Sequence, residues 1–156
     1  MERSCCFDTP AGPLTVTAVG EAVTAVRFGA FGPAFESVEE LPPVLRQAVV
    51  ELREYFAGTR RAFTLPLAPA GTPFQQEVWA ALREIPYGET RTYGQIAARI
   101  GRPKACRAVG MANNRNPIGL VVPCHRVVGA SGALVGYAAG LAVKEMLLRL
   151  ERMNNE

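Results

Sequence analysis

Apolar residues in the first sixty positions change from a strand-like to a helical period. β-Branched runs over residues 14–19 and 23–28 flank Gly20-Glu21, which predicts a β-hairpin. After Pro42-Pro43, apolar side chains recur at helical spacing over residues 45–56, and Gly58 follows as a C-terminal stop. Residues 63–67 are a further candidate strand. The first part therefore predicts a small α/β unit.

A change of composition separates this part from the rest. Residues 66–71 read Pro-Leu-Ala-Pro-Ala-Gly, which is typical of a linker. The sequence therefore predicts two domains, residues 1–68 and 69–156.

The second part opens with a strong helix start. Thr72 is a capping residue, Pro73 suits the first helical position and Gln75 completes a capping box. Apolar residues from 74 to 85 then share one face, and Pro86-Tyr87-Gly88 ends the helix. This apolar face is expected to belong to the core.

Two short helices with a tight break follow. Thr92 caps a helix over 93–100, Gly101 ends it, and Pro103 or Lys104 begins a second helix that runs to about Asn113. Helix, short turn and helix form a helix-turn-helix pattern, which by itself is weak evidence for DNA binding.

The last third is apolar, then rich in glycine, then helical. Residues 118–122 form a continuous apolar run that predicts a buried strand or extended segment leading to Pro123-Cys124-His125. Four glycines between 129 and 140 surround Tyr137, and an amphipathic helix is expected from about Leu141.

Charge is distributed unevenly along this chain of 156 residues. The formal net charge is +3, yet no carboxylate occurs between Glu89 and Glu145, whereas eight basic residues do. Such a window attracts polyanions, although a merely solvated basic face is the alternative. No stretch is long and apolar enough to span a bilayer and no signal peptide is present, so we expect a soluble, cytoplasmic protein with no membrane partner.

The four cysteines are Cys5, Cys6, Cys106 and Cys124, and in such a chain they are not expected to form disulfides. The only histidine is His125, so no metal site is expected.

The chemistry-bearing pair is Cys124-His125. A thiol attacks efficiently only as a thiolate, and its ordinary pKa of about 8.5 leaves little thiolate at neutral pH. A neighbouring imidazole acts as a base, usually oriented by a third group. Glu145 and Glu151 are equal candidates for that group. The alternative is that Cys124 is an inert buried residue.

These residues resemble the active-site signature of the methylated-DNA–protein-cysteine methyltransferases, the O6-alkylguanine-DNA alkyltransferase family. The match carries Pro123-Cys124-His125-Arg126-Val127-Val128, with agreement in order over residues 71–151. The flanking matches are Gly71-Thr72-Pro73-Phe74-Gln75-Gln76, Ile85-Pro86-Tyr87-Gly88-Glu89, Arg107-Ala108-Val109-Gly110, Asn116-Pro117 and Lys144-Glu145.

The resemblance implies a fold and a set of active-site roles. It implies an α/β N-terminal domain with a small ribonuclease-H-like sheet plus a helix, then a mainly α-helical domain with a helix-turn-helix. Cys124 would be the alkyl acceptor, His125 its base through a water, and Glu151 rather than Glu145 the group that orients His125. The other implied residues are Tyr93 on the flipped guanine, Asn116 at the turn, and Tyr137, Ala138, Val127 and Lys144 at the pocket.

The resemblance also implies the partner, double-stranded DNA that contains alkylated guanine. Arg107 would fill the space of the flipped base, with Lys104, Arg115 and Ala108 also at the DNA. The reaction would consume Cys124 and need no cofactor, and the protein would act as a monomer. Two other classes stay open at this point: a non-catalytic relative that binds alkylated DNA, and a cysteine hydrolase. Alkyl-group preference and activity on O4-methylthymine are left open by the sequence.

Overall fold

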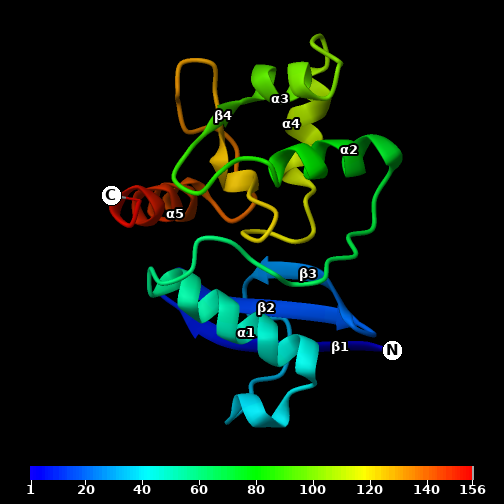
Figure 1. Ribbon diagram of the computed structural model, residues 1–156, viewed down its shortest axis with the longest axis vertical. Helices are drawn as coiled ribbons and strands as arrows, with labels where there is room; N and C mark the ends of the chain where they lie inside the picture. The colour runs from blue at the N-terminus through cyan, green and yellow to red at the C-terminus, as the bar shows by residue number, and fades with distance from the viewer. Residues whose placement is uncertain (156) are drawn as a thin grey trace. The chain divides into compact units, whose positions relative to one another are not determined.

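The computed structural model describes residues 1–155 and forms two compact units that divide between residues 70 and 71. The first unit holds an antiparallel sheet in the order β1 (Glu2–Thr9), β2 (Gly12–Val19) and β3 (Ala22–Phe28). Helix α1 (Pro43–Phe56) lies along one face of this sheet (Figure 1). Its buried apolar residues, Leu45, Ala48, Val49, Leu52 and Tyr55, have the predicted helical spacing.

Two details of the first unit differ from the prediction. Strand β1 was not predicted, because charged residues at its start obscure an alternation in which only Cys5 and Phe7 are buried. Residues 63–67 do not form a strand of the sheet, since only a single parallel bridge joins Leu67 to Val23. The hairpin between residues 14 and 28 is confirmed.

The second unit is mainly helical. Its elements are α2 (Pro73–Leu82), β4 (Arg91–Thr92), α3 (Tyr93–Arg99), α4 (Cys106–Asn114), η2 (Cys124–Arg126), β5 (Val127–Val128) and α5 (Leu141–Met153). The predicted capping box of Thr72 with Gln75 is confirmed, and so is Thr92 as the cap of α3, where Gln95 completes a second capping box that was not predicted. Gly101 follows α3 with φ +77°, a backbone conformation that favours glycine.

The second helix of the helix-turn-helix begins later than predicted. Residues 102–105 form a turn in which the Ala105 amide donates to the Arg102 carbonyl, and α4 starts at Cys106. Pro103 suits this turn as well as it suits a helix start, so the sequence did not separate the two. Lys104 consequently lies in the turn and not on the helix.

The apolar side chains of residues 118–122 are buried as predicted, but the segment turns over residues 119–121 and does not form a strand. Val121 donates to Gly119 and Val122 to Ile118, and Leu120 has φ +70°. A short apolar run does not by itself distinguish a buried strand from another buried segment.

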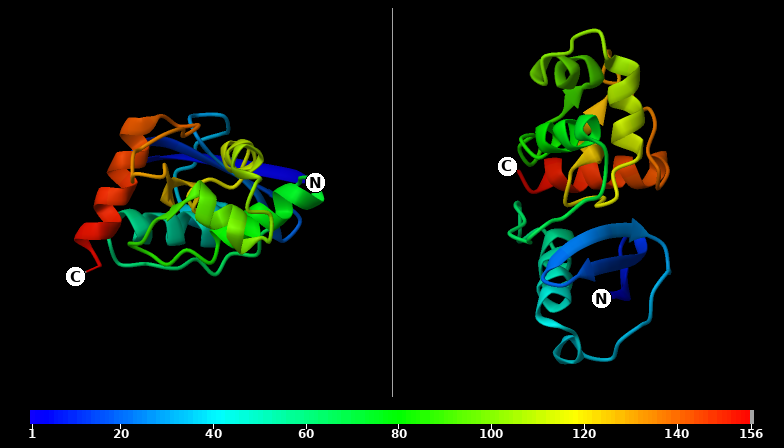
Figure 2. Two further views of the ribbon diagram at one scale, coloured as in Figure 1. Left: turned by 90° about the horizontal axis from the view of Figure 1, so that it is seen from above. Right: turned by 90° about the vertical axis from the view of Figure 1, so that its right-hand side faces the viewer.

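Figures 1 and 2 show how the second unit is arranged. The α3–α4 pair lies at one side and α5 at the other, with α2 and η2 between them. The turn that carries Cys124 therefore lies between the helix-turn-helix and α5. Within residues 1–155, no helix has the length and apolarity needed to cross a membrane.

Candidate functional site

The reactive turn is held in place by a single asparagine side chain. Asn116 Nδ2 donates to the carbonyl of Val122 at 2.8 Å and to that of Ile118 at 3.3 Å, and its Oδ1 accepts from the Ile118 amide at 3.0 Å. Because the amide side chain satisfies backbone groups that a strand would have paired, the chain turns here and delivers Cys124 at the first position of η2.

Cys124 is buried, with 6% of its surface exposed. Burial raises the pKa of its thiol above the ordinary value, and hydrogen bonding with Asn116 and the positive charge of Lys144 offset only part of the rise. The resting side chain is therefore a neutral thiol. A reaction at this sulfur needs a group that takes the proton.

His125 and Glu151 form a fully buried pair. His125 Nε2 lies 2.6 Å from Glu151 Oε2, and neither residue is exposed. Burial lowers the pKa of His125, and the hydrogen bond and charge of Glu151 oppose that shift without cancelling it. A carboxylate only accepts, so the neutral imidazole carries its proton on Nε2. Within the described residues, His125 Nδ1 has no hydrogen-bond partner and is free to accept a proton.

The residues alone left Glu145 and Glu151 as equal candidates and the family resemblance chose Glu151, which the structure places beside His125. Burial alone would raise the pKa of Glu151, but hydrogen bonds and charges from His125 and Arg126 outweigh it and bring the pKa to about 2. Glu145, by contrast, is exposed and pairs with Arg149 one helical turn away.

The sequence analysis gave neither Arg126 nor Gly88 a role in the active site, and both bind Glu151. Arg126 Nε donates to Glu151 Oε1 at 2.8 Å and its Nη2 to Oε2 at 3.1 Å, while the Gly88 amide donates to Oε1 at 3.1 Å. Gly88 has φ +81°, and a Cβ there would lie 2.5 Å from the Asn155 side chain. The sequence held one signal for the role of Arg126, because it lies within the mainly apolar stretch 118–128 and a buried guanidinium requires a partner.

Tyr93 and Lys144 meet at the glycine-rich loop. Tyr93 Oη donates to the Val135 carbonyl at 3.2 Å, and Lys144 Nζ donates to the same carbonyl at 2.9 Å and to that of Gly136 at 3.2 Å. Burial raises the pKa of Tyr93, so its hydroxyl stays a neutral donor. Lys144 is fully buried, and burial lowers its pKa.

The other predicted pocket residues lie in different surroundings. The Tyr137 hydroxyl is buried and interacts with Cys124, and burial raises its pKa well above the ordinary value. Val127 is buried in β5, where it pairs with Arg91 of β4. Ala138 is exposed in the turn before α5, so the structure does not bring it into the buried cluster.

The residues predicted at the DNA are all exposed. Arg107 and Ala108 lie in the first turn of α4, Lys104 in the turn before it and Arg115 at its end. Within residues 1–155, no carboxylate lies within ion-pair distance of Lys104, Arg107 or Arg115. A hollow of about 200 Å³ beside them includes Met111, an apolar side chain with 61% exposure that the sequence did not single out.

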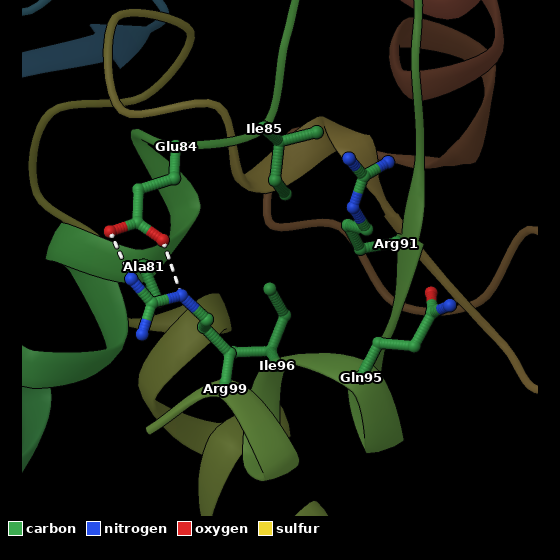
Figure 3. Close-up of a pocket in the computed structure, with 7 residues that line it drawn as sticks. All are labelled: Ala81, Glu84, Ile85, Arg91, Gln95, Ile96 and Arg99. Atoms are coloured by element: carbon green, nitrogen blue, oxygen red, sulfur yellow. Dashed lines mark hydrogen bonds and ion pairs between the residues drawn. The ribbon is translucent and has the colours of Figure 1, made fainter. Parts of the chain in front are cut away.

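A separate pocket of about 310 Å³ lies between the end of α2 and α3 (Figure 3). Glu84 pairs with Arg99 on one side, Arg91 and Gln95 lie on the other, and Ile85 and Ile96 lie between them. Arg91 is itself paired with Glu89. Because both arginines already have carboxylate partners, the pocket is not a free anion site. No predicted site residue lines it.

The described part of the chain brings together no cluster of three or more histidine, cysteine, aspartate or glutamate side chains that would hold a metal. What it does bring together is a thiol, a neutral imidazole with a free acceptor nitrogen, and an ionised carboxylate that orients the imidazole. This set fits the class of proteins in which a cysteine acts as a nucleophile.

Comparison with known proteins identifies the family within that class. Residues 73–153 match the 6-O-methylguanine DNA methyltransferase DNA binding domain, and residues 5–69 match the ribonuclease-like domain of the same family. The chain belongs to the 6-O-methylguanine DNA methyltransferase family, and the resemblance seen in the sequence is confirmed.

Individual relatives agree along nearly the whole chain. The methylated-DNA–protein-cysteine methyltransferase of Methanosarcina acetivorans is 53% identical over 148 residues, covering 93% of this chain and 95% of the relative. The protein of that name from Mycobacterium tuberculosis is 49% identical over 148 residues, covering 94% of this chain and 90% of the relative.

Solved structures confirm the expected fold class. The crystal structure of Mycobacterium tuberculosis O6-methylguanine methyltransferase has a TM-score of 0.87 at 46% identity, covering 99% of this chain and 94% of the other. The crystal structure of Mycobacterium tuberculosis OGT in complex with DNA has a TM-score of 0.88 at 45% identity, covering 97% and 94%.

Proposed function

We propose that this protein is a methylated-DNA–[protein]-cysteine S-methyltransferase. It repairs DNA by moving the alkyl group of O6-alkylguanine onto its own Cys124. The observation that carries the proposal is the buried His125–Glu151 pair next to that cysteine in the fold of this family. A hydrolase or a binding-only relative is not favoured by the names of the relatives.

The reaction is a displacement at the alkyl carbon. The Cys124 proton passes by way of a water to His125 Nδ1, and the sulfur attacks the carbon. A C–S bond forms as the C–O6 bond breaks, and guanine recovers its carbonyl. The departing guanine takes up the proton that Cys124 released to His125, so the base leaves neutral, His125 is neutral again and no net charge builds up in the pocket. Tyr93 exchanges its hydrogen bond to the Val135 carbonyl for one to the departing base.

Each other buried side chain has a supporting role. Asn116 fixes the turn that aims Cys124, which its three hydrogen bonds to that turn support. Lys144 places a positive charge near the developing thiolate, and Tyr137 and Val127 line the pocket. Ala138, exposed in the turn after Tyr137, borders the pocket entrance.

Double-stranded DNA is the substrate-bearing partner. The alkylated oxygen lies on a base edge inside the stack, so the nucleotide is flipped into the pocket. Helix α4 docks on the duplex with Arg107 filling the vacated space, Ala108 allowing close approach and Lys104 and Arg115 binding phosphates. The lack of carboxylate partners for these three cations among residues 1–155 supports the assignment.

The product fixes the kinetic outcome. A thioether is not cleaved by imidazole or carboxylate chemistry, so each molecule reacts once and stays alkylated. No cofactor takes part, because DNA supplies the alkyl group. The protein acts as a monomer, and its location is the cytoplasm, a reducing compartment that four free thiols support.

Transfer of a labelled methyl group tests this function. Duplex DNA carrying labelled O6-methylguanine is mixed with the protein, and the label is expected on the polypeptide. Cys124→Ala is expected to abolish transfer completely while the affinity for methylated duplex is retained. DNA binding without any transfer by the native protein identifies a binding-only relative and rejects the proposal.

A further inference from the structure

The guanidinium of Arg126 has a partner at every nitrogen. Nε and Nη2 donate to the two carboxylate oxygens of Glu151, and Nη1 donates to the Ile85 carbonyl at 2.7 Å. Its Cζ also lies 5.7 Å from the centre of the Tyr87 ring. Only 6% of Arg126 is exposed. A guanidinium bound at all three nitrogens is held in one orientation, and so is the carboxylate that it binds.

Glu151 Oε2 is shared by two donors. His125 Nε2 lies 2.6 Å from it and Arg126 Nη2 lies 3.1 Å from it. A carboxylate whose charge is partly neutralised by a bound guanidinium attracts the imidazolium less strongly than a carboxylate without that guanidinium would. Arg126 therefore affects how readily His125 takes up a proton while touching neither the thiol nor the substrate.

We propose that Arg126 is a positioning residue of the site. It orients Glu151 and divides its charge, and thereby keeps His125 neutral with the proton on Nε2, so that Nδ1 is the acceptor for the Cys124 proton. Only the effect of Arg126 on alkyl transfer rests on the proposed function. The state of the imidazole follows from the contacts themselves.

The other charged and titratable groups near His125 set the direction of the effect. Helix α5 contributes Glu151 and Lys144, η2 contributes Cys124 and Arg126, and Tyr137 of the glycine-rich loop contacts Cys124. Lys144 and Arg126 both disfavour a charged imidazole, and Glu151 favours it. Loss of Arg126 removes one of the two cations and leaves the full charge of Glu151 on His125. The affinity of His125 for a proton then rises.

The experiment uses the fact that His125 is the only histidine of the chain. Nitrogen-15 NMR of its imidazole reports both tautomer and titration without ambiguity and without DNA. In the native protein we expect the Nε2–H tautomer at neutral pH. In Arg126→Gln we expect the imidazole pKa to rise by about 1 to 3 units, the range for a charge lost within contact distance. Arg126→Lys keeps a charge and is expected to shift less than half as far.

A matched control comes from α5. Arg149 forms an exposed pair with Glu145, so Arg149→Gln removes an arginine–glutamate pair without approaching the site. It is expected to leave the imidazole spectrum unchanged. A native imidazole protonated on Nδ1 overturns the proposal even if Arg126→Gln does not fold. So does a folded Arg126→Gln protein whose histidine titrates as in the native protein, or one whose imidazole pKa shifts no further than that of Arg126→Lys.

Single-turnover methyl transfer against pH supplies the functional readout. Since only the neutral imidazole accepts the thiol proton, the acid limb of the rate is expected to move to higher pH in Arg126→Gln, in step with the NMR titration. If the imidazole pKa rises in Arg126→Gln but the native protein transfers no methyl group, the Arg126 assignment stands and the proposed function is rejected. If the folded Arg126→Gln protein transfers methyl groups with the acid limb of its pH–rate profile unchanged, only the role assigned to Arg126 is rejected.

Discussion

Among residues 1–155, each unit of this protein buries one glutamate, and the two carboxylates are satisfied in different ways. Glu51 of α1 accepts from the Thr64 amide and hydroxyl, at 2.8 and 2.6 Å, and from Gln47 at 2.8 Å. Glu151 of α5 accepts from His125, Arg126 and Gly88. Burial raises the pKa of both and hydrogen bonding outweighs it, so both are lowered.

The two glutamates differ in what their hydrogen-bond donors are connected to. The partners of Glu51 tie residue 64 to α1, together with an ion pair to Arg60 at 3.8 Å, and none of them connects Glu51 to a nucleophile. The partner of Glu151 is an imidazole whose second nitrogen has no partner among residues 1–155 and which follows Cys124 directly. A buried carboxylate is thus no mark of an active site by itself. The mark of an active site here is a buried carboxylate bound to one ring nitrogen of a histidine whose other ring nitrogen can accept a proton.

The largest expected effect comes from Glu151→Gln. An amide no longer fixes the imidazole proton on Nε2 and leaves Arg126 buried without a counter-charge. We expect the methyl-transfer rate to fall by about 10² to 10⁴, the usual contribution of general-base catalysis, because His125 no longer holds Nδ1 ready to accept the proton. The measurement is single-turnover transfer from methylated duplex DNA. A rate within a factor of two of the native one would show that Glu151 is as structural as Glu51.

Acid provides the next test. The pKa of Glu151 is about 2 in the folded protein against 4.5 for the free side chain, so its ionised form stabilises the fold above pH 4.5. That stabilisation is lost as the pH falls from 4.5 toward 2, and it amounts to about 3 kcal/mol.

Trp79 is the only tryptophan, is buried in α2 and reports unfolding of the second unit by fluorescence. The stability difference between the native protein and Glu151→Gln should shrink steadily below pH 4.5. A difference that stays constant with pH would contradict the assigned ionisation.

Arg107→Ala tests the exposed half of the site. We expect transfer from duplex DNA to slow by roughly ten- to a hundredfold, corresponding to 1–3 kcal/mol, because the flipped state loses the side chain that replaces the base. Transfer from free O6-methylguanine base should be unchanged. Arg99→Ala, which removes an arginine already paired with Glu84, is the control. Equal losses on duplex and free base would remove Arg107 from the flipping step.

The smallest expected effect on activity is that of Glu51→Gln. This change weakens the contacts of α1 with residue 64 and should destabilise the first unit by about 1–3 kcal/mol, the usual cost of an unsatisfied buried partner. Hydrogen exchange of the α1 amides measures it. Methyl transfer below the unfolding temperature is expected to stay at the native rate, and a loss of activity would show that the comparison between the two glutamates is false.

The elements with local signals were predictable from the sequence. Thr72 and Thr92 cap their helices as predicted, and Gly101 follows α3, because these signals act over three or four residues. The turn at 118–122 was not predictable, because the Asn116 side chain replaces the strand pairing that the apolar run indicates. The division of Glu151 between His125 and Arg126 depends on contacts 25 and 26 residues apart, which no local pattern contains.

The central claim is that Cys124 accepts one alkyl group and keeps it. Titration of O6-methylguanine duplex against a fixed amount of protein, with mass spectrometry of the product, tests it most directly. Repair should stop at one methyl group per chain, and that group should lie on Cys124 and on no other cysteine. Repair that continues beyond one equivalent, or a methyl group on Cys5, Cys6 or Cys106 in its place, would contradict the account.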